Sequence, residues 1–477
     1  MREHLLSRRT FLGGGLAAAG SAFVPDIWAD EARPLLAFGV ITDVHIGGRS
    51  TAEARLETAL RWLESHGAEA ILCAGDITHA GRISQLQTFA DTWYKVFPNG
   101  KASDGRKVEF MLSTGNHDAD DSFWANATEE TMRDQRLTYG TNPTRVLKEL
   151  FDIDWSLVWK REIKGFTFIG SQWPSLNPDL VGYVSAHSSE FDPNLPFFHC
   201  QHEHPKGTCH GSYGSGFDNG ASVTALSPYP NAVAFSGHSH CTIADERAIW
   251  QGAFTSIGAG CLHEGGLTFS MENCTAFWHA SYQTKLQRSL NDDATMWGGD
   301  KDGGGFLFVE AFADHLVVHR RSTAFAEPMG PDWIVPVPAP GAGGKFDFAV
   351  RTATRSAPQF AADAQVVATL CPNGHALELP ARSGESCVHV TFPAARPVRG
   401  ARVFDYLVEV YDGSTCVASG VYGAAGFSWP EARADVPTEC LFATSALPAG
   451  KSLVFAVTPR ECFGRAGRTI RSAAFTI

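Results

Sequence analysis

Continuous apolar runs that alternate with amphipathic segments dominate the first two thirds of the chain. Residues 35–42 and 70–74 are predicted as buried strands, and residues 51–65 between them place apolar side chains at helical spacing. The pattern repeats with a helix over 83–96 and a strand over 108–113. Further strands are predicted over 166–171, 197–201, 232–236, 254–257, 306–312 and 316–319. Strands of this kind belong in sheets covered on both faces, which predicts an α/β layered domain over residues 34–325.

A segment rich in proline and glycine separates this domain from a region of different character. Residues 326–350 contain Pro-Val-Pro-Ala-Pro followed by Gly-Ala-Gly-Gly and are predicted to be a linker. Beyond it the helical periodicity disappears, and apolar and polar residues alternate over 404–411. Short strands separated by turn residues are expected near 416–421 and 452–457. This pattern predicts an all-β sandwich over residues 351–477.

The composition limits the kind of protein. At 477 residues the chain is longer than one hydrophobic core usually fills, which agrees with two domains. The net charge of -12 disfavours a protein that binds nucleic acid by covering phosphates with basic side chains. A small phosphate ester remains compatible with this charge, because bound metal ions reverse the sign of the local field. The sequence predicts nothing about the oligomeric state.

The first 30 residues are predicted to lie outside the fold. Ser-Arg-Arg-Thr-Phe-Leu at residues 7–12 precedes a mildly apolar stretch over 13–24, and the combination resembles a bacterial twin-arginine signal peptide. The resemblance implies export of a folded protein to the periplasm, the cell surface or the medium. The alternatives are a short membrane anchor or a chance arginine pair. No other segment is expected to span a membrane, and the 11 cysteines show no spacing that fixes a disulfide pairing.

Five short polar motifs follow the predicted strands. They are Asp43-Val44-His45, Gly75-Asp76, Gly115-Asn116-His117-Asp118, Gln201-His202 and Gly237-His238-Ser239-His240. Open α/β sheets place their ligands at the carboxyl ends of strands, and these motifs supply a mixture of carboxylate, amide and imidazole donors. Such a mixture suits a pair of divalent metal ions, with Asp76 as the best candidate to bridge them.

The order and composition of these motifs resemble the calcineurin-like metallophosphoesterase superfamily over roughly residues 37–319. The resemblance implies a four-layer α/β/β/α sandwich with a dinuclear metal centre. It implies that one ion is bound by Asp43, His45 and His240, that the other is bound by Asn116, His202 and His238, and that Asp76 bridges both. It further implies in-line attack on phosphorus by a metal-bridging hydroxide, with His117 as general acid or phosphate contact and Asp118 orienting His117.

Two positions depart from the family pattern. The family commonly has its ligand histidine two residues before a proline, where Glu203 stands here between His202 and His204. His202 is preferred because it directly follows a predicted strand, while His204 and Glu203 remain alternatives. Purple acid phosphatases have a metal-binding tyrosine three residues after the bridging aspartate, where this chain has His79, which we expect to contact substrate or a ligand rather than a metal.

The C-terminal region carries a second resemblance. Residues 447–457, followed by Phe-Gly-Arg at 463–465, resemble the last strands of a fibronectin type III domain, although Leu453 stands where that family usually has tyrosine. Another immunoglobulin-like sandwich is the alternative. Long loops over 206–230 and 261–305 flank the last metal motif and are expected to form walls beside the centre. Their aromatic residues, Tyr213, Phe217, Phe277, Trp278, Tyr282 and Trp297, are candidates for stacking on a substrate or for anchoring the loops.

The motifs and the signal together predict an exported, metal-dependent phosphoric ester hydrolase acting on a small phosphate ester. Monoester hydrolysis is slightly favoured over diester hydrolysis. A surface-binding protein that keeps this scaffold without turnover is the alternative, which the complete ligand set and His117 disfavour. Mixed oxygen and nitrogen donors accept iron, manganese or zinc, so the sequence leaves the metal open.

Overall fold

The computed structural model describes residues 33–119, 143–173, 179–210, 217–262, 303–376, 383–398 and 402–477. The signal predicted at residues 1–30 lies outside this part of the chain. Residues 35–477 form one compact unit. None of the helices in the described ranges is long and apolar enough to cross a membrane. No disulfide joins the cysteines within these ranges.

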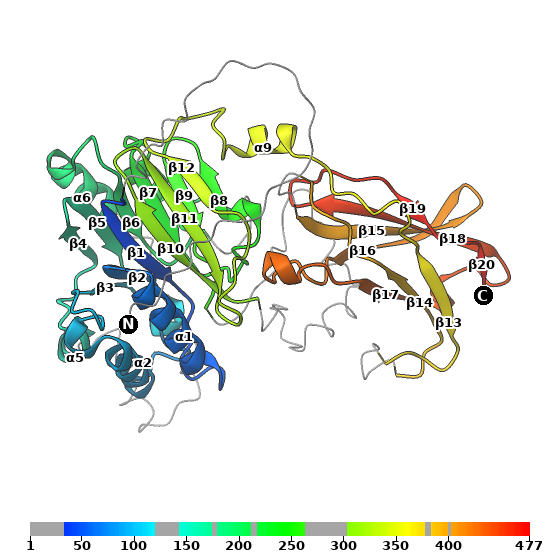
Figure 1. The fold of residues 1–477 in the computed structure, drawn as a ribbon, viewed down its shortest axis with the longest axis horizontal. Helices are drawn as coiled ribbons and strands as arrows, with labels where there is room; N and C mark the ends of the chain where they lie inside the picture. The colour runs from blue at the N-terminus through cyan, green and yellow to red at the C-terminus, as the bar shows by residue number, and fades with distance from the viewer. Residues whose placement is uncertain are drawn as a thin grey trace, which may run out of the picture. The chain divides into compact units, whose positions relative to one another are not determined.

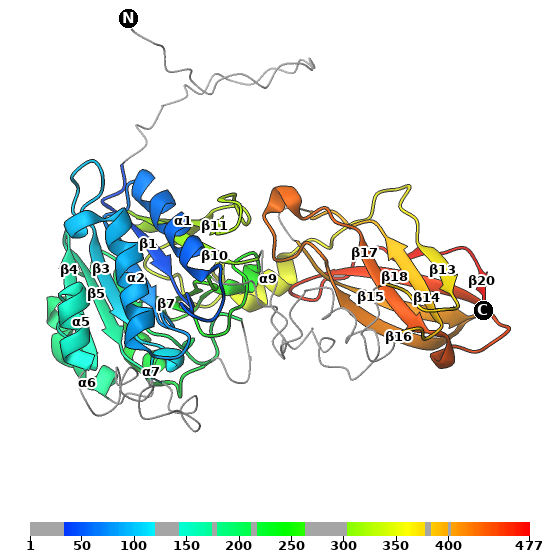
Figure 2. The same cartoon turned by 90° about the horizontal axis from the view of Figure 1, so that it is seen from below.

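The first sheet has the strand order β12-β11-β10-β1-β2-β3 (Figure 1). Its strands are β1 (Leu36–Ile41), β2 (Ala70–Ala74), β3 (Glu109–Ser113), β10 (Gly305–Ala311), β11 (His315–Ser322) and β12 (Trp333–Pro336). Strands β1, β2 and β3 are parallel because α1 (Ala52–Ser65) and α2 (Ile83–Val96) return the chain between them. Both helices lie over one face of this sheet (Figure 2). The helices and strands predicted here are confirmed within one residue at each end, except that β11 continues three residues beyond the predicted end at 319.

The second sheet has the order β4-β5-β6-β7-β9-β8. Its strands are β4 (Val158–Ile163), β5 (Phe166–Ser171), β6 (Phe197–Cys200), β7 (Ala232–Ser236), β8 (Ile249–Gln251) and β9 (Thr255–Gly258). The four strands β5, β6, β7 and β9 are parallel, and every residue in them is buried. Helices α6 (Asp179–His187) and α7 (Ala221–Leu226) share a hydrophobic cluster with this sheet, while α5 (Pro143–Phe151) belongs to the cluster of α1 and α2.

The two sheets pack against each other through an aromatic core. The ring of Phe38 on β1 lies 5.3 Å from Phe168, 4.9 Å from Phe198 and 5.8 Å from Phe235, all three on the second sheet. Helices cover the outer face of each sheet. The predicted four-layer α/β/β/α sandwich is therefore confirmed, and its parallel strands are apolar because each face is covered.

The C-terminal region is an all-β sandwich, as predicted. One sheet contains β13 (Val367–Cys371), β14 (Cys387–Phe392) and β17 (Thr438–Ala443), and the other contains β16 (Thr415–Gly423), β15 (Val403–Asp412), β18 (Ser452–Glu461), β19 (Ile470–Arg471) and β20 (Phe475–Thr476). All the pairings are antiparallel, and apolar residues of both sheets share one core. The alternation seen over 404–411 reflects one face of β15 packing in that core.

The segment rich in proline and glycine is packed as well. It contributes β12 to the edge of the first sheet and buries Met329 in the core between the sheets. It then leads into α9 (Phe348–Thr354), where the side chain of Asp347 accepts hydrogen bonds from the N–H groups of Ala349 and Val350. Arg351 on α9 contacts Glu246 of the α/β/β/α sandwich, with an Nη2 to Oε2 distance of 2.5 Å.

Candidate metal centre

Hydrogen bonds between the two sheets bring the carboxyl ends of their strands to one edge. The hydroxyl of Ser113, at the end of β3, donates to the carbonyl of Cys200 at 3.0 Å. Nδ1 of His202, directly after β6, donates to the carbonyl of Ala74 at 2.7 Å. The N–H of Gly237 donates in turn to the carbonyl of His202 at 2.8 Å. All five polar motifs predicted from the sequence therefore meet at this edge.

Close backbone contacts explain two of the motif glycines. A Cβ atom at Gly237 would lie 1.9 Å from Oγ1 of Thr42 and 2.3 Å from Oδ2 of Asp43. At Gly115 it would lie 2.2 Å from Oδ1 of Asp76. Any larger residue at either position would displace a carboxylate, so glycine is required to bring the motifs together.

The backbone at the motifs is strained. Asp43, His45, Asp76, His238 and His240 all have positive φ angles, between 50° and 67°. The left-handed region is uncommon for residues other than glycine and costs of the order of 1 kcal/mol or more per residue. Surrounding structure must hold these residues in place, and such strain typically gathers at functional sites.

A first group of ligand atoms converges from three motifs. One atom each from Asp43, His45, Asp76 and His240 lies within 4.8 Å of all the others. Nε2 of His240 is 3.0 Å from Nε2 of His45 and 3.1 Å from Oδ1 of Asp43. Nε2 of His45 is also 3.7 Å from Oδ2 of Asp76. These separations suit ligands around one ion with bonds of about 2.0–2.2 Å.

A second group shares Asp76 with the first. Nε2 of His202 lies 3.1 Å from Oδ2 of Asp76 and 3.1 Å from Oδ1 of Asn116. The ring of His238 lies 4.9 Å from that of His202. Nδ1 of His202 donates to the Ala74 carbonyl. In the neutral ring, Nε2 of His202 therefore carries the lone pair, and it faces Asp76 and Asn116. The two groups meet at the carboxylate of Asp76.

The two ionised aspartates give both groups of ligand atoms a negative potential that favours a bound cation. Burial by itself would raise the pKa of Asp43, but His240, His45 and His202 together hold it well below its usual value. Burial would likewise lower the pKa of His202, yet Asp76 and Asp43 raise it to about 9. Two buried, ionised carboxylates close together require compensating cations. The residues present thus fit a pair of metal ions by donor type, spacing and charge.

The structure distinguishes between the two histidines of the fourth motif. His202 contacts Asp76 and Asn116, as described above. His204 instead lies with Nδ1 2.7 Å from Oγ of Ser236 and Nε2 2.7 Å from Oγ of Ser239. The side chain at this centre is therefore that of His202.

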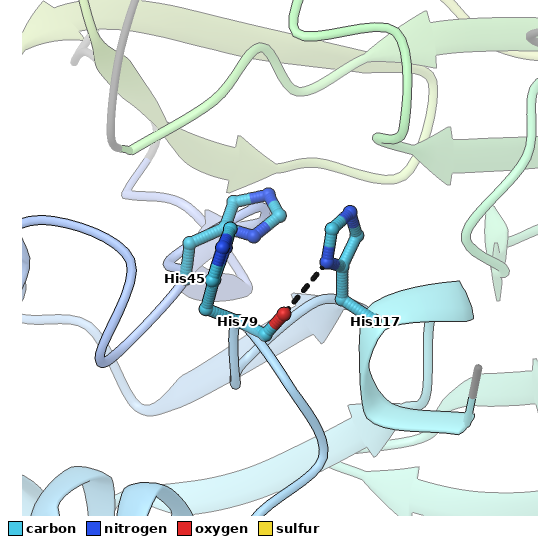
Figure 3. Close-up of side chains that lie close together, drawn as sticks. All are labelled: His45, His79 and His117. Carbon is cyan, nitrogen blue, oxygen red and sulfur yellow. Dashed lines mark hydrogen bonds between the residues drawn. The ribbon is translucent and has the colours of Figure 1, made fainter. Parts of the chain in front are cut away.

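His117 stands beside the two groups rather than within them. Its Nδ1 donates to the carbonyl of His79 at 2.8 Å, and its backbone N–H donates to Oδ1 of Asp76 at 2.8 Å. Its ring lies 4.6 Å from that of His45 and stacks at 5.3 Å on that of His79 (Figure 3). The bond to the carbonyl fixes Nδ1 as a donor, and Figure 3 shows Nε2 on the side of the ring away from that carbonyl.

Asp118 has a different place from the one expected. Its carboxylate accepts hydrogen bonds from the N–H and hydroxyl of Thr78 at 2.9 and 2.8 Å, from the N–H of Gly115 at 3.0 Å and from that of Ile77 at 3.3 Å. The ring of His117 is oriented by His79 instead. Asp118 thus joins the loops that follow β2 and β3, and it supports His117 through the backbone.

One aromatic residue beside the centre was not anticipated. Trp173 is half-buried, with its ring 5.9 Å from that of His238 and 6.2 Å from that of His202. Trp173 lies two residues after β5. Its position after a predicted strand is the feature of the sequence that could have indicated a place beside the centre. Among the aromatic loop residues, Phe217 is half-buried near His204, and the others named above lie outside the described ranges.

Residues 36–242 match the family of calcineurin-like phosphoesterases. The chain contains a calcineurin-like metallophosphoesterase domain. The matched region of this metallophosphoesterase domain contains all five motifs. Strands β10, β11 and β12 follow the matched region in the sequence and complete the first sheet. No curated protein matches the chain.

Several solved structures are similar in fold. A dimetal phosphatase from Danio rerio is 11% identical with a TM-score of 0.37, and the match covers 64% of this chain and 99% of that one. The purple acid phosphatase PPD1 from yellow lupin (Lupinus luteus) seeds is 13% identical with a TM-score of 0.40, covering 61% and 52%. GAP50, the anchor in the inner membrane complex of Plasmodium, is 11% identical with a TM-score of 0.38, covering 63% and 88%. Similarity this low transfers no activity to this chain.

Proposed function

We propose that this protein is an exported phosphoesterase that works with two metal ions and hydrolyses small phosphate esters, with monoesters slightly favoured over diesters. The observation that carries the proposal is the carboxylate of Asp76, which is shared by two groups of ligand atoms at the common edge of both sheets. A single-ion site would not need this arrangement.

The proposed ligands follow from the distances. Asp43, His45 and His240 would hold one ion, Asn116, His202 and His238 would hold the other, and Asp76 would bind both. Two ions at such a site supply Lewis acidity, which lowers the pKa of bound water and neutralises charge on the phosphoryl oxygens. Iron, manganese and zinc all suit these donors.

The chain itself supplies a proton donor for the leaving group. With Nδ1 of His117 donating to the His79 carbonyl, the proton available for transfer is the one on Nε2 of the protonated ring. The backbone bond from His117 to Asp76 ties the position of this ring to the proposed bridging ligand. A proton delivered to the leaving oxygen as the phosphorus–oxygen bond breaks prevents departure of an unstable alkoxide.

Export and the C-terminal sandwich complete the proposal. The twin-arginine resemblance over residues 1–30 supports passage across the membrane in folded form, which suits a protein whose ligands converge only after folding. The C-terminal sandwich, built from strands β13 to β20, is antiparallel and all-β, in keeping with a fibronectin type III-like module. We propose that this module acts as a spacer or attachment unit rather than as part of the chemistry.

Two variants test the catalytic proposal on a panel of phosphate mono- and diesters. Asp76→Ala should lower the metal content, because it removes a ligand of both ions, and activity should fall with it. His117→Ala should retain the metal content and lower kcat by about 10²–10⁴-fold, the usual contribution of general acid catalysis. Absence of activity on the whole panel by the metal-loaded wild type would instead favour the non-catalytic binding protein.

A further inference from the structure

A further cluster of side chains that could hold a metal ion lies outside the proposed dinuclear centre. His204, Cys209 and His210 follow β6, and one ligand atom from each lies within 4.8 Å of the other two. All three residues are buried, with at most 1% of each exposed. These three side chains form the His-Cys-His cluster.

The spacing within the cluster suits a single ion. The sulfur of Cys209 lies 3.4 Å from Nδ1 of His204. A tetrahedral Zn²⁺ ion with bonds of about 2.3 Å to sulfur and about 2.0 Å to nitrogen separates two such ligands by about 3.5 Å. The ring centres of His204 and His210 are 5.2 Å apart, and one nitrogen of each ring lies within 4.8 Å of the Cys209 sulfur.

His210 supplies independent evidence for a ligand. Both of its ring nitrogens are buried without a hydrogen-bond partner among the described residues. Burial lowers the pKa of His210 to about 4, so the ring is neutral and one nitrogen carries a lone pair. An imidazole with neither nitrogen satisfied is rare in a protein interior, because losing both contacts with water is unfavourable. A metal ion would satisfy one of the two nitrogens.

The surrounding backbone is also arranged around these rings. A Cβ atom at Gly258, the last residue of β9, would lie 2.9 Å from Nε2 of His210 and 3.3 Å from Cε1 of His204. His210 itself has a φ of 61°, in the left-handed region. Glycine at 258 and the unusual conformation at 210 together make room for two imidazoles beside a thiol.

We propose that the His-Cys-His cluster binds a third metal ion of the Zn²⁺ class, in a structural site separate from the dinuclear centre. Thiolate and imidazole ligands favour Zn²⁺ over Mg²⁺, Ca²⁺ and Mn²⁺, which prefer oxygen. The ion displaces the thiol proton of Cys209 to solvent, and the hydroxyl of Ser256, 3.5 Å from the sulfur, donates to the resulting thiolate. The hydroxyl of Ser236, now 2.7 Å from Nδ1 of His204, rotates away as the ion binds.

The position of the cluster suggests what this ion does. With the ion on Nδ1 of His204, the proton of that ring resides on Nε2, which then donates to Oγ of Ser239. Ser239 lies between His238 and His240, two proposed ligands of the dinuclear centre. The third ion therefore anchors the loop that presents these two histidines.

Metal counting and absorption spectroscopy test the proposal on the folded wild-type protein. Elemental analysis should give three ions per chain. Replacement by Co²⁺ should give a thiolate-to-cobalt charge-transfer band in the near ultraviolet, which the oxygen and nitrogen ligands of the dinuclear centre cannot produce. Two ions and no such band would overturn the proposal, and so would a disulfide between Cys209 and another cysteine found by mass spectrometry. Neither readout depends on phosphoesterase activity.

Matched variants locate the third ion. Cys209→Ala should lose one ion and the charge-transfer band while keeping the other two ions. Cys200→Ala is the control, because Cys200 is an equally buried free thiol on β6 outside the cluster, and this variant should keep all three ions. His210→Ala should behave like Cys209→Ala. A band that persists in Cys209→Ala contradicts the assignment, and if that variant does not fold, the wild-type spectrum still decides.

Discussion

Glu246 holds together three arginines from two parts of the chain, and its replacement gives a quantitative test of the structure. Its carboxylate lies 2.8 Å from Nη2 of Arg320 on β11, 2.5 Å from Nη2 of Arg351 on α9 and 2.8 Å from Nη2 of Arg355. The side chain of Arg320 is fully buried, and those of Glu246 and Arg351 are 10% and 4% exposed. Removing the single anion leaves these cations uncompensated in a region of low polarity.

The magnitude follows from the pKa of Glu246. Burial would raise it, but Arg320, Arg351 and Arg355 lower it from 4.5 to about 2. At 1.36 kcal/mol per pKa unit, this difference corresponds to about 3 kcal/mol of stabilisation. Loss of one partner from a buried ion pair costs about 3–5 kcal/mol, which agrees. We therefore expect Glu246→Gln to lower the free energy of unfolding at neutral pH by about 3–5 kcal/mol.

The sign of the pH dependence is fixed by the same values. Because the pKa of Glu246 is lower in the folded state, its stabilisation is complete above pH 4.5 and is lost as the pH falls towards about 2. The difference between wild type and Glu246→Gln should narrow over that range. Loss of metal ions in acid affects both proteins alike and cancels in the difference.

Urea unfolding followed by circular dichroism, at neutral pH and at about pH 3, measures both effects. Glu327→Gln is the control, because Glu327 pairs with Arg433 at 2.7 Å between the same two parts of the chain, but at the surface. This control should change the stability little. Equal stability of the two variants at neutral pH, or a difference that does not shrink in acid, would refute the reasoning.

Three further predictions concern the metal centre. His202→Ala should lower the occupancy of the dinuclear centre, whereas His204→Ala should leave those two ions in place and lose only the third, as measured by elemental analysis. Gly237→Ala should weaken metal binding, because its Cβ would displace the carboxylate of Asp43. Gly182→Ala is the control, because a Cβ at that position would have no atom within 4 Å, and metal titration compares the two variants. Asp118→Ala leaves three backbone N–H groups without their acceptor. It should lower the free energy of unfolding, measured by urea denaturation, by about 1–3 kcal/mol or more.

The sequence determined the elements whose signal is local. The strands of residues 36–41 and 70–74 are apolar at every position because both faces are covered, and α1 repeats its buried side chains at helical spacing. Strands such as β4 escaped prediction, because only Val158 and Trp159 of its six residues are buried. The edge strand β12 escaped because its composition resembles a linker, and its pairing with β11 depends on residues far away in the sequence.

The same division holds for the metal centre. The motifs and their order came from the sequence, since each follows a strand whose end lies at a shared edge. The sequence preferred His202 to His204 as the ligand of the fourth motif. The structure distinguishes them because it is His202 that donates a hydrogen bond to the Ala74 carbonyl, 128 residues away. The Thr78 groups that donate to Asp118 lie 40 residues away in the sequence, and the two rings beside Gly258 belong to His204 and His210 in another segment. Residue type and position after a strand thus predicted which side chains are candidate metal ligands, whereas the long-range packing of the two sheets decided which of them lie close together.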